Sequence, residues 1–204
     1  MARAGLDADA VVAAAAGVAD ERGLDGLTLA LLARGLGVKT PSLYAHIDGL
    51  ADLRVRLAIR GARELAASLH RAAGGRARGE ALHAVADAYR AYAHAHPGTY
   101  AALQVPSADP EHGAAAQEVI VAIAAVLRGY GIEGDEAIHA IRVIRSALHG
   151  FVALEQIGGF ALALRLDDSY ERLVEMLDAG LTARASPAPS GPPSTNSPAA
   201  TASG

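Results

Sequence analysis

The sequence contains no cysteine and no tryptophan, and its formal net charge is −4. Without cysteine there can be no disulfide, no thiolate nucleophile and no Cys-ligated zinc or iron–sulfur site. The chain also lacks the basic surplus of many nucleic-acid-binding proteins, so any such signal must be local. The apolar run 11–19 is too short to span a membrane, and Asp7 and Asp9 precede it where a signal peptide would be positive. We therefore predict a soluble, cytoplasmic protein with no membrane partner.

Apolar residues make up 51% of the chain, which argues against global disorder. Alanine, the best helix former, supplies 49 of the 204 residues, and no segment keeps a period-2 alternation for long. We predict an all-α fold of about nine helices, with three short helices in front of a bundle of longer ones. The helical pattern covers residues 7–22, 28–36, 40–47, 50–73, 80–96, 111–130, 134–157 and 167–184. Residues 186–204 hold five of the nine prolines and no charge, and we predict a disordered tail there.

The most informative segment is 28–47, TLALLARGLGVKTPSLYAHI. Thr28 is a candidate N-cap and Gly37 a candidate left-handed C-cap, so two short helices would be joined by a tight turn, as in a helix-turn-helix. In the second helix Thr40 is the candidate N-cap. Leu43 and Ile47 stand four apart and can be buried together. The polar, cationic and aromatic residues around them can then reach base edges and phosphates. Spacing alone leaves open an ordinary helical hairpin with a polar exposed face.

The residues themselves go further than the spacing. The run Leu36-Gly37-Val38 followed by Pro41-Ser42-Leu43-Tyr44-Ala45-His46-Ile47 resembles the recognition helix of the TetR family of repressors, and the resemblance covers residues 5 to about 55. The order and length of the later helices are also similar to that family. Leu148-His149-Gly150 resembles the Trp-His-Gly motif of one subgroup, with Leu in place of Trp.

This resemblance implies a helix-turn-helix DNA-binding domain at 1–50 and a ligand-binding and dimerisation domain at 51–185. It also implies a homodimer on a palindromic operator of double-stranded DNA. The DNA-binding candidates carried over from the motif are Thr28, Lys39, Thr40, Pro41, Ser42, Tyr44 and His46. Two features depart from the family pattern: Ala30 stands where many relatives have Arg, and residues 1–60 hold seven cations against seven acids. We therefore expect a shallow salt dependence of DNA binding.

A stripe of amphipathic side chains marks a candidate site for a small-molecule effector in the rear helices. Tyr89, Tyr92, His96 and Tyr100 recur at spacings of three and four, and Arg145 and His149 add polar groups to an apolar helix. Ligand pockets are mostly apolar with a few placed polar groups, which fits this composition. The alternative is that the rings pack on the core and leave their polar tips in water.

Catalytic, metal and cofactor sites find little support. His94 and His96 are two apart and so face different sides of a helix, and no Gly-x-Ser-x-Gly motif is present. We predict no enzyme, no metal and no cofactor. We predict a ligand-responsive repressor that is released from its operator by an inducer. The alternative is a helical small-molecule carrier or enzyme with a vestigial helix-turn-helix, a reading that Ala30 and the neutral front keep open.

Overall fold

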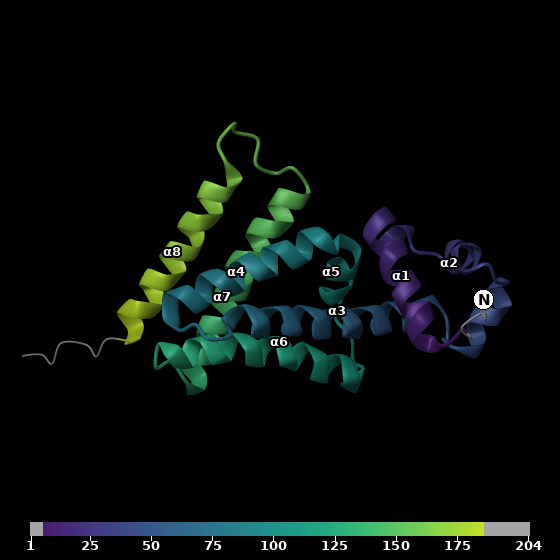
Figure 1. Ribbon diagram of the computed structural model, residues 1–204, viewed down its shortest axis with the longest axis horizontal. Coiled ribbons are helices and arrows are strands. Elements are labelled where there is room, and N and C mark those ends of the chain that lie inside the picture. Colours follow the sequence, from purple (N-terminus) through teal and green to yellow (C-terminus); the bar gives the residue numbers. More distant parts are fainter. Residues whose placement is uncertain (1–5, 186–204) are drawn as a thin grey trace, which may run out of the picture.

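The computed structural model describes residues 6–185 and consists of helices throughout that range (Figure 1). Eight α-helices and two 3-10 helices follow one another along these residues, without a strand among them. Their bounds are α1 Ala8–Arg22, η1 Leu24–Gly26, α2 Leu29–Leu36, η2 Thr40–Ala45, α3 Leu50–Ala73, α4 Arg78–Ala95, α5 Pro97–Leu103, α6 Pro110–Gly129, α7 Gly134–Gln156 and α8 Leu166–Ala185. The all-α prediction is confirmed. The predicted disordered tail, 186–204, lies outside the described residues.

The predicted caps of α2, Thr28 and Gly37, are confirmed, and α1 has an N-cap of the same kind. Asp7 Oδ1 accepts a hydrogen bond from the backbone N–H of Ala10 at 2.8 Å and caps α1. Thr28 Oγ1 accepts from Leu31 N at 3.2 Å and caps α2. Gly37 ends α2 with φ of 67°, a left-handed conformation that glycine adopts without a steric penalty.

The third predicted helix differs from expectation in its type and in its cap. Residues Thr40–Ala45 form a 3-10 helix, in which Ser42 N bonds Lys39 O and His46 N bonds Leu43 O, both at 2.9 Å. Lys39 occupies the N-cap position with no side-chain cap bond, so the prediction of Thr40 as N-cap is wrong. A six-residue segment closes few i→i+4 bonds, and 3-10 geometry is common in such short pieces.

Helix α5 lies between the predicted helices 80–96 and 111–130, where the sequence pattern predicts no helix. The proline sits at the start of α5, where a missing N–H costs nothing. Close packing then fixes the short helix in place. A Cβ at Gly98 would lie 2.0 Å from the carbonyl oxygen of Ala19 in α1, so only glycine allows this approach. On its other side α5 contacts α3, where a Cβ at Gly61 would lie 2.8 Å from a methyl group of Thr99.

Three hydrophobic clusters form the core of the described residues, and α3 takes part in all of them: a front cluster, a rear cluster and a small one of Ile59, Ala62 and Ala115 between α3 and α6. The front cluster gathers α1, η1, α2 and η2 around Leu53 and Leu57 at the start of α3. The rear cluster gathers α4 to α8 around Leu65 and Leu69 further along the same helix. Figure 1 shows α3 running from the front helices into the bundle. A movement of α3 therefore displaces side chains in both the front and the rear cluster.

Among the described residues, one helix, α7, is long and apolar enough to cross a membrane, by length and composition alone. Its buried side chains Ile141, Ile144 and Leu148 belong to the rear core. The core helix of a soluble protein meets the same test, so α7 is weak evidence for a membrane span.

Candidate nucleic-acid interface and bundle cavities

The 3-10 helix η2 presents most of the predicted DNA-contacting side chains to solvent. Leu43 and Ile47 are buried in the front cluster, as the four-residue spacing predicts. Tyr44 keeps 58% of its surface exposed although it is a large aromatic residue. A tyrosine left in water beside a buried core needs a reason, and a partner surface is one. The exposed set is completed by Lys39, Pro41 and Ser42, whereas Thr40 and His46 are half-buried.

Thr28 lies at the exposed start of α2. Because its hydroxyl oxygen already accepts from Leu31 N, the hydroxyl hydrogen remains available to donate. The first turn of a helix also carries free N–H groups and the positive end of the helix dipole. This end of α2 can therefore receive a phosphate.

The cations of the front are divided between internal ion pairs and solvent. Arg54 donates to Leu24 O at 3.2 Å and lies 3.7 Å from Asp25, and the Arg56 Nε donates to Asp52 at 2.9 Å. In the described part of the chain, Lys39 and the exposed Arg34 of α2 have no recorded ion pair. Sequence reasoning did not single out Arg34.

The structure separates the six predicted effector residues, and three of them form a buried hydrogen-bonded chain. The hydroxyl oxygens of Tyr89 and Tyr100 are 2.8 Å apart, and Tyr100 Oη lies 2.6 Å from His149 Nδ1. Burial, and after it the charge of Arg145, lowers the pKa of His149, which favours the neutral ring. Burial raises the pKa of both tyrosines, which keeps them protonated.

Tyr89 and Arg145 line a small cavity between α3, α5, α6 and α7. Its volume is about 60 Å³. At its mouth one Arg145 guanidinium nitrogen lies 3.5 Å from the Oε1 atom of Gln104, a long contact. The other lining residues are apolar: Ala62, Leu65, Leu103, Ala116, Val119, Ile120, Ile123 and Ile141.

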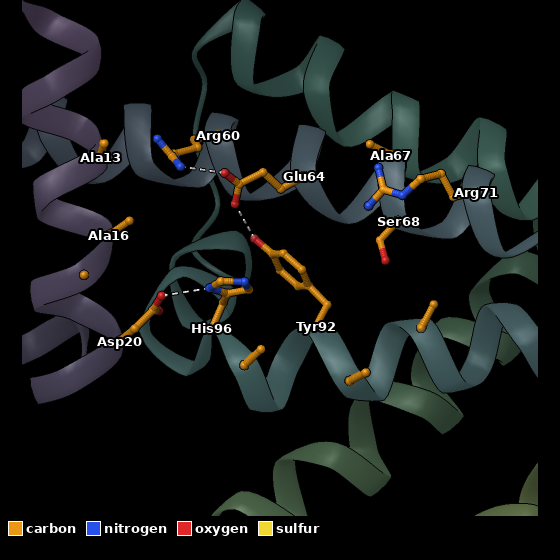
Figure 2. Close-up of a pocket in the computed structure, with 14 residues that line it drawn as sticks. Ala13, Ala16, Asp20, Arg60, Glu64, Ala67, Ser68, Arg71, Tyr92 and His96 are labelled. Atoms are coloured by element: carbon orange, nitrogen blue, oxygen red, sulfur yellow. Dashed lines mark hydrogen bonds and ion pairs between the residues drawn. The ribbon is translucent and has the colours of Figure 1, made fainter.

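Tyr92 and His96 line a different and larger cleft of about 690 Å³ between α1, α3 and α4 (Figure 2). The Tyr92 hydroxyl donates to Glu64 at 3.2 Å, and Glu64 pairs with Arg60 at 2.8 Å. His96 lies 3.1 Å from Asp20. These polar groups are paired with one another across the cleft, so they brace the front against the bundle.

The two places are connected through α5. Asp20 of α1 accepts from the backbone N–H of Thr99 at 2.8 Å as well as contacting His96. The next residue, Tyr100, joins the buried chain beside the small cavity. Sequence reasoning missed both Asp20 and Gln104, because their partners are distant in the chain and no local pattern marks them.

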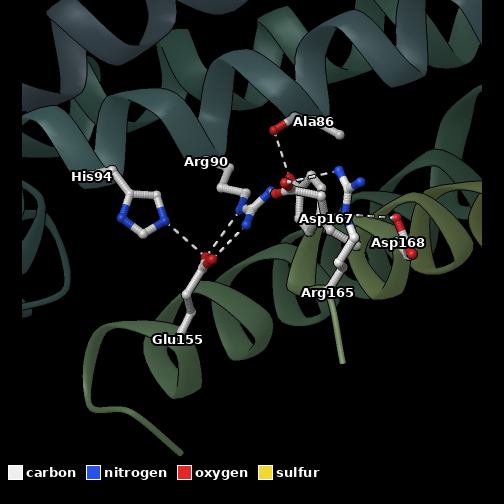
Figure 3. A network of polar contacts seen from close by, with 8 residues as sticks. Ala86, Arg90, His94, Glu155, Arg165, Asp167 and Asp168 are labelled. Atoms are coloured by element: carbon white, nitrogen blue, oxygen red, sulfur yellow. Dashed lines mark hydrogen bonds and ion pairs between the residues drawn. The ribbon is translucent and has the colours of Figure 1, made fainter. Parts of the chain in front are cut away.

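Arg90 of α4, which sequence reasoning also missed, holds the end of α7 and the start of α8 (Figure 3). Its guanidinium makes two bonds to the Glu155 carboxylate, at 2.9 and 2.5 Å, and one to Asp167 at 2.9 Å. It also lies 4.8 Å from the ring centroid of Tyr170. His94 Nε2 adds a contact of 2.7 Å to Glu155. The hydrogen bond from Arg90 is the main reason that the pKa of Glu155 is lowered.

Within residues 6–185, no group of three or more His, Asp or Glu side chains is arranged to hold a metal ion.

Comparison with known proteins shows which family has these features. Residues 82–177 match the family model "Tetracyclin repressor-like, C-terminal domain". The chain is 43% identical over 156 residues to an uncharacterised HTH-type transcriptional regulator of Mycobacterium tuberculosis, Rv0681, covering 75% of this chain and 72% of the relative. It is 36% identical over 154 residues to a second such regulator, YobS of Bacillus subtilis, covering 74% and 80%.

The fold is shared with solved structures. One is a Q116A variant of TetR from Acinetobacter baumannii in complex with minocycline, with a TM-score of 0.67, 24% identity, and coverage of 90% of this chain and all of that one. This structure shows the shared fold, and the family model and the two relatives show the sequence similarity. The chain belongs to the TetR family of helix-turn-helix transcriptional regulators.

Proposed function

We propose that the protein is a homodimeric, ligand-responsive repressor without catalytic activity, which acts in the cytoplasm and leaves a palindromic operator when an inducer binds. The observation that carries the DNA-binding half is the exposure of Tyr44 on η2, directly beside the buried Leu43. Family membership supplies the class of partner, and the exposed polar face of η2 supplies a surface of suitable chemistry. Residues 1–50 would form the DNA-binding domain and 51–185 the ligand-binding and dimerisation domain.

On the DNA, each candidate residue has a role that follows from its chemistry. Thr28 and the first turn of α2 would bind one phosphate, and Lys39 another. Ser42 and Thr40 would reach base edges by hydrogen bonding, and Tyr44 would donate its hydroxyl to the backbone. Pro41 would pack against sugar or a thymine methyl, and His46 would brace the end of η2.

The repressor would be a dimer formed through α7 and α8. Ile138, Val143 and Met176 are 49%, 58% and 74% exposed on these two helices. Large apolar side chains left in water on neighbouring helices favour burial against a second copy. A two-fold axis there would set two copies of η2 about one DNA turn apart, roughly 34–36 Å.

Release would follow the contacts of α5. A ligand that enlarges the small cavity pushes on Leu103 at the end of α5. That helix packs against Gly61 of α3 and holds Asp20 of α1 through Thr99. Both front contacts would shift together, and a coupling of about 1–3 kcal/mol is sufficient to change operator affinity measurably.

Selection of duplexes from a random DNA pool tests the proposal. We expect enrichment of a palindrome, bound by a species that light scattering identifies as a dimer at micromolar concentration. A monomer, or a pool without an enriched palindrome, would contradict it. Tyr44→Ala separates the alternatives: a repressor loses operator binding, whereas a carrier or enzyme keeps its ligand affinity unchanged.

A further inference from the structure

The small cavity beside Tyr89 contains one cationic group and no acid to neutralise it. Among the described residues that line it, Arg145 is the single charged side chain. Its recorded contact in this part of the chain is the long one, 3.5 Å, to the neutral amide of Gln104. Its charge opposes part of the rise that burial causes in the pKa of Tyr89 and Tyr100, and it helps to lower the pKa of His149. The polar end of the cavity therefore has a positive potential.

The hydrogen-bonding groups at that end are arranged as donors. Gln104 offers its Oε1 to Arg145, which leaves the amide N–H₂ group to donate elsewhere. Arg145 has further guanidinium N–H groups to give. The Tyr89 hydroxyl is paired with that of Tyr100, 2.8 Å away. An anionic acceptor fits this end, whereas a second cation would meet a positive charge with no partner.

The remaining walls are aliphatic and come from three long helices. Leu65 of α3, Ile120 and Ile123 of α6 and Ile141 of α7 surround the space. Burying an apolar ligand surface among them is favourable by about 25 cal/mol per Å². The site thus combines an apolar interior with one anion-binding mouth.

We propose that the effector is a lipophilic carboxylate, whose charged head is bound at the mouth by Arg145 and Gln104 and whose hydrocarbon body lies among the aliphatic walls. This proposal rests on the proposed function, for which it names the class of inducer. Because Arg145 is exposed, the head stays in contact with water and need not be fully desolvated.

The size of the cavity explains why such a ligand would act as an inducer. A volume of about 60 Å³ is far below the roughly 300 Å³ or more of typical ligand pockets. The hydrocarbon body must therefore separate α3, α5 and α6 in order to enter. Leu103 lies on α5, and Asp20 of α1 accepts a hydrogen bond from Thr99 of the same helix. A ligand that displaces α5 therefore also displaces α1.

Calorimetric titration of the full chain with matched ligands tests the proposal. Octanoate and phenylpropanoate are each compared with the primary amide and primary amine of equal length. We expect the carboxylates to bind about tenfold or more tightly than the amides, as a charge-assisted hydrogen bond requires, and the amines to bind more weakly still. Equal affinity of carboxylate and amide, tighter binding of the amines, or binding of neither carboxylate overturns the proposal.

Variants on α7 assign the preference to one side chain. Arg145→Gln should abolish the preference for carboxylate over amide, and Arg145→Lys should keep part of it. Arg142→Gln is the matched control, because Arg142 is exposed on the same helix and does not line the cavity. A preference that survives Arg145→Gln, or that is lost equally in Arg142→Gln, overturns the proposal.

Operator binding is measured separately from ligand binding. A wild-type chain that binds its selected operator but shows no carboxylate preference refutes this inference and leaves the proposed repressor function intact. Arg145-dependent carboxylate binding in a protein that selects no operator supports the inference about the cavity and refutes the repressor.

Discussion

Removing Arg90 should destabilise the bundle more than any surface charge change. The side chains of Arg90 and Glu155 are only 18% and 10% exposed, so this is a largely buried, bidentate pair. Breaking a buried pair by removing one partner costs about 3–5 kcal/mol. In the variant His94 still donates a hydrogen bond to Glu155, and the ion pair is partly exposed to water. Both features reduce the loss of stability. We expect Arg90→Ala to lower the free energy of unfolding by about 3 kcal/mol, including roughly 0.5–1 kcal/mol from the ring of Tyr170.

The assay is urea unfolding at one fixed protein concentration, followed by circular dichroism, with a double-mutant cycle of Arg90→Ala and Glu155→Ala. The cycle should give a coupling energy of about 1.5–3 kcal/mol, the range for hydrogen bonds to charged groups. Arg165→Ala is the control, since Arg165 is 76% exposed and lies 3.6 Å from Asp168, a surface pair. That variant should change stability by less than about 0.5 kcal/mol. A coupling below about 0.5 kcal/mol, or equal effects of Arg90→Ala and Arg165→Ala, would refute the reasoning.

Three further outcomes are expected. Gly98→Ala should lower the free energy of unfolding by about 1–3 kcal/mol, because the new Cβ meets the Ala19 carbonyl oxygen. The control Gly113→Ala, in open space on α6, should be neutral or stabilising. Equal melting temperatures of the two variants would contradict the α1–α5 contact. The folded pKa of Glu155 is lowered, so its contribution to stability is full above the unfolded pKa of about 4.3 and is lost as the pH falls through the folded value. Acid titration of stability should therefore be flatter in Arg90→Ala, and an unchanged profile would argue against the pair. With seven cations and seven acids in residues 1–60, the slope of log K against log salt should be shallower than about −8, and a steeper slope would mean roughly nine phosphate contacts.

The sequence predicted the elements whose signals are local. Thr28 and Gly37 begin and end α2 through bonds within four residues, and the structure confirms both positions. The buried face of η2 could also be predicted from the sequence, because Leu43 and Ile47 are neighbours on one short segment. Helix α5 was missed because its stability comes from packing on α1 and α3 rather than from its own seven residues.

The candidate effector site shows the same limit more sharply. A spacing of three and four identified Tyr89, Tyr92, His96 and Tyr100 as one stripe. In the structure Tyr89 lines the cavity, Tyr92 and His96 line the cleft, and Tyr100 lines neither. Each side of α4 meets different partners, and those partners lie far away in the chain. The distances that decide the division, such as Tyr92 to Glu64, cannot be read from periodicity. The candidate DNA-binding residues remain predictions from the motif.

Fluorescence anisotropy of a labelled, selected operator tests the central claim most directly, with the wild-type chain compared with Tyr44→Ala. Tyr44 is 58% exposed, so its replacement should leave the melting temperature nearly unchanged. The account predicts tight, palindrome-dependent binding by the wild type and a loss of about tenfold or more in Tyr44→Ala, equal to roughly 1.4 kcal/mol. Equal operator affinity in the two proteins, or wild-type binding that does not distinguish the palindrome from a scrambled duplex, would contradict it.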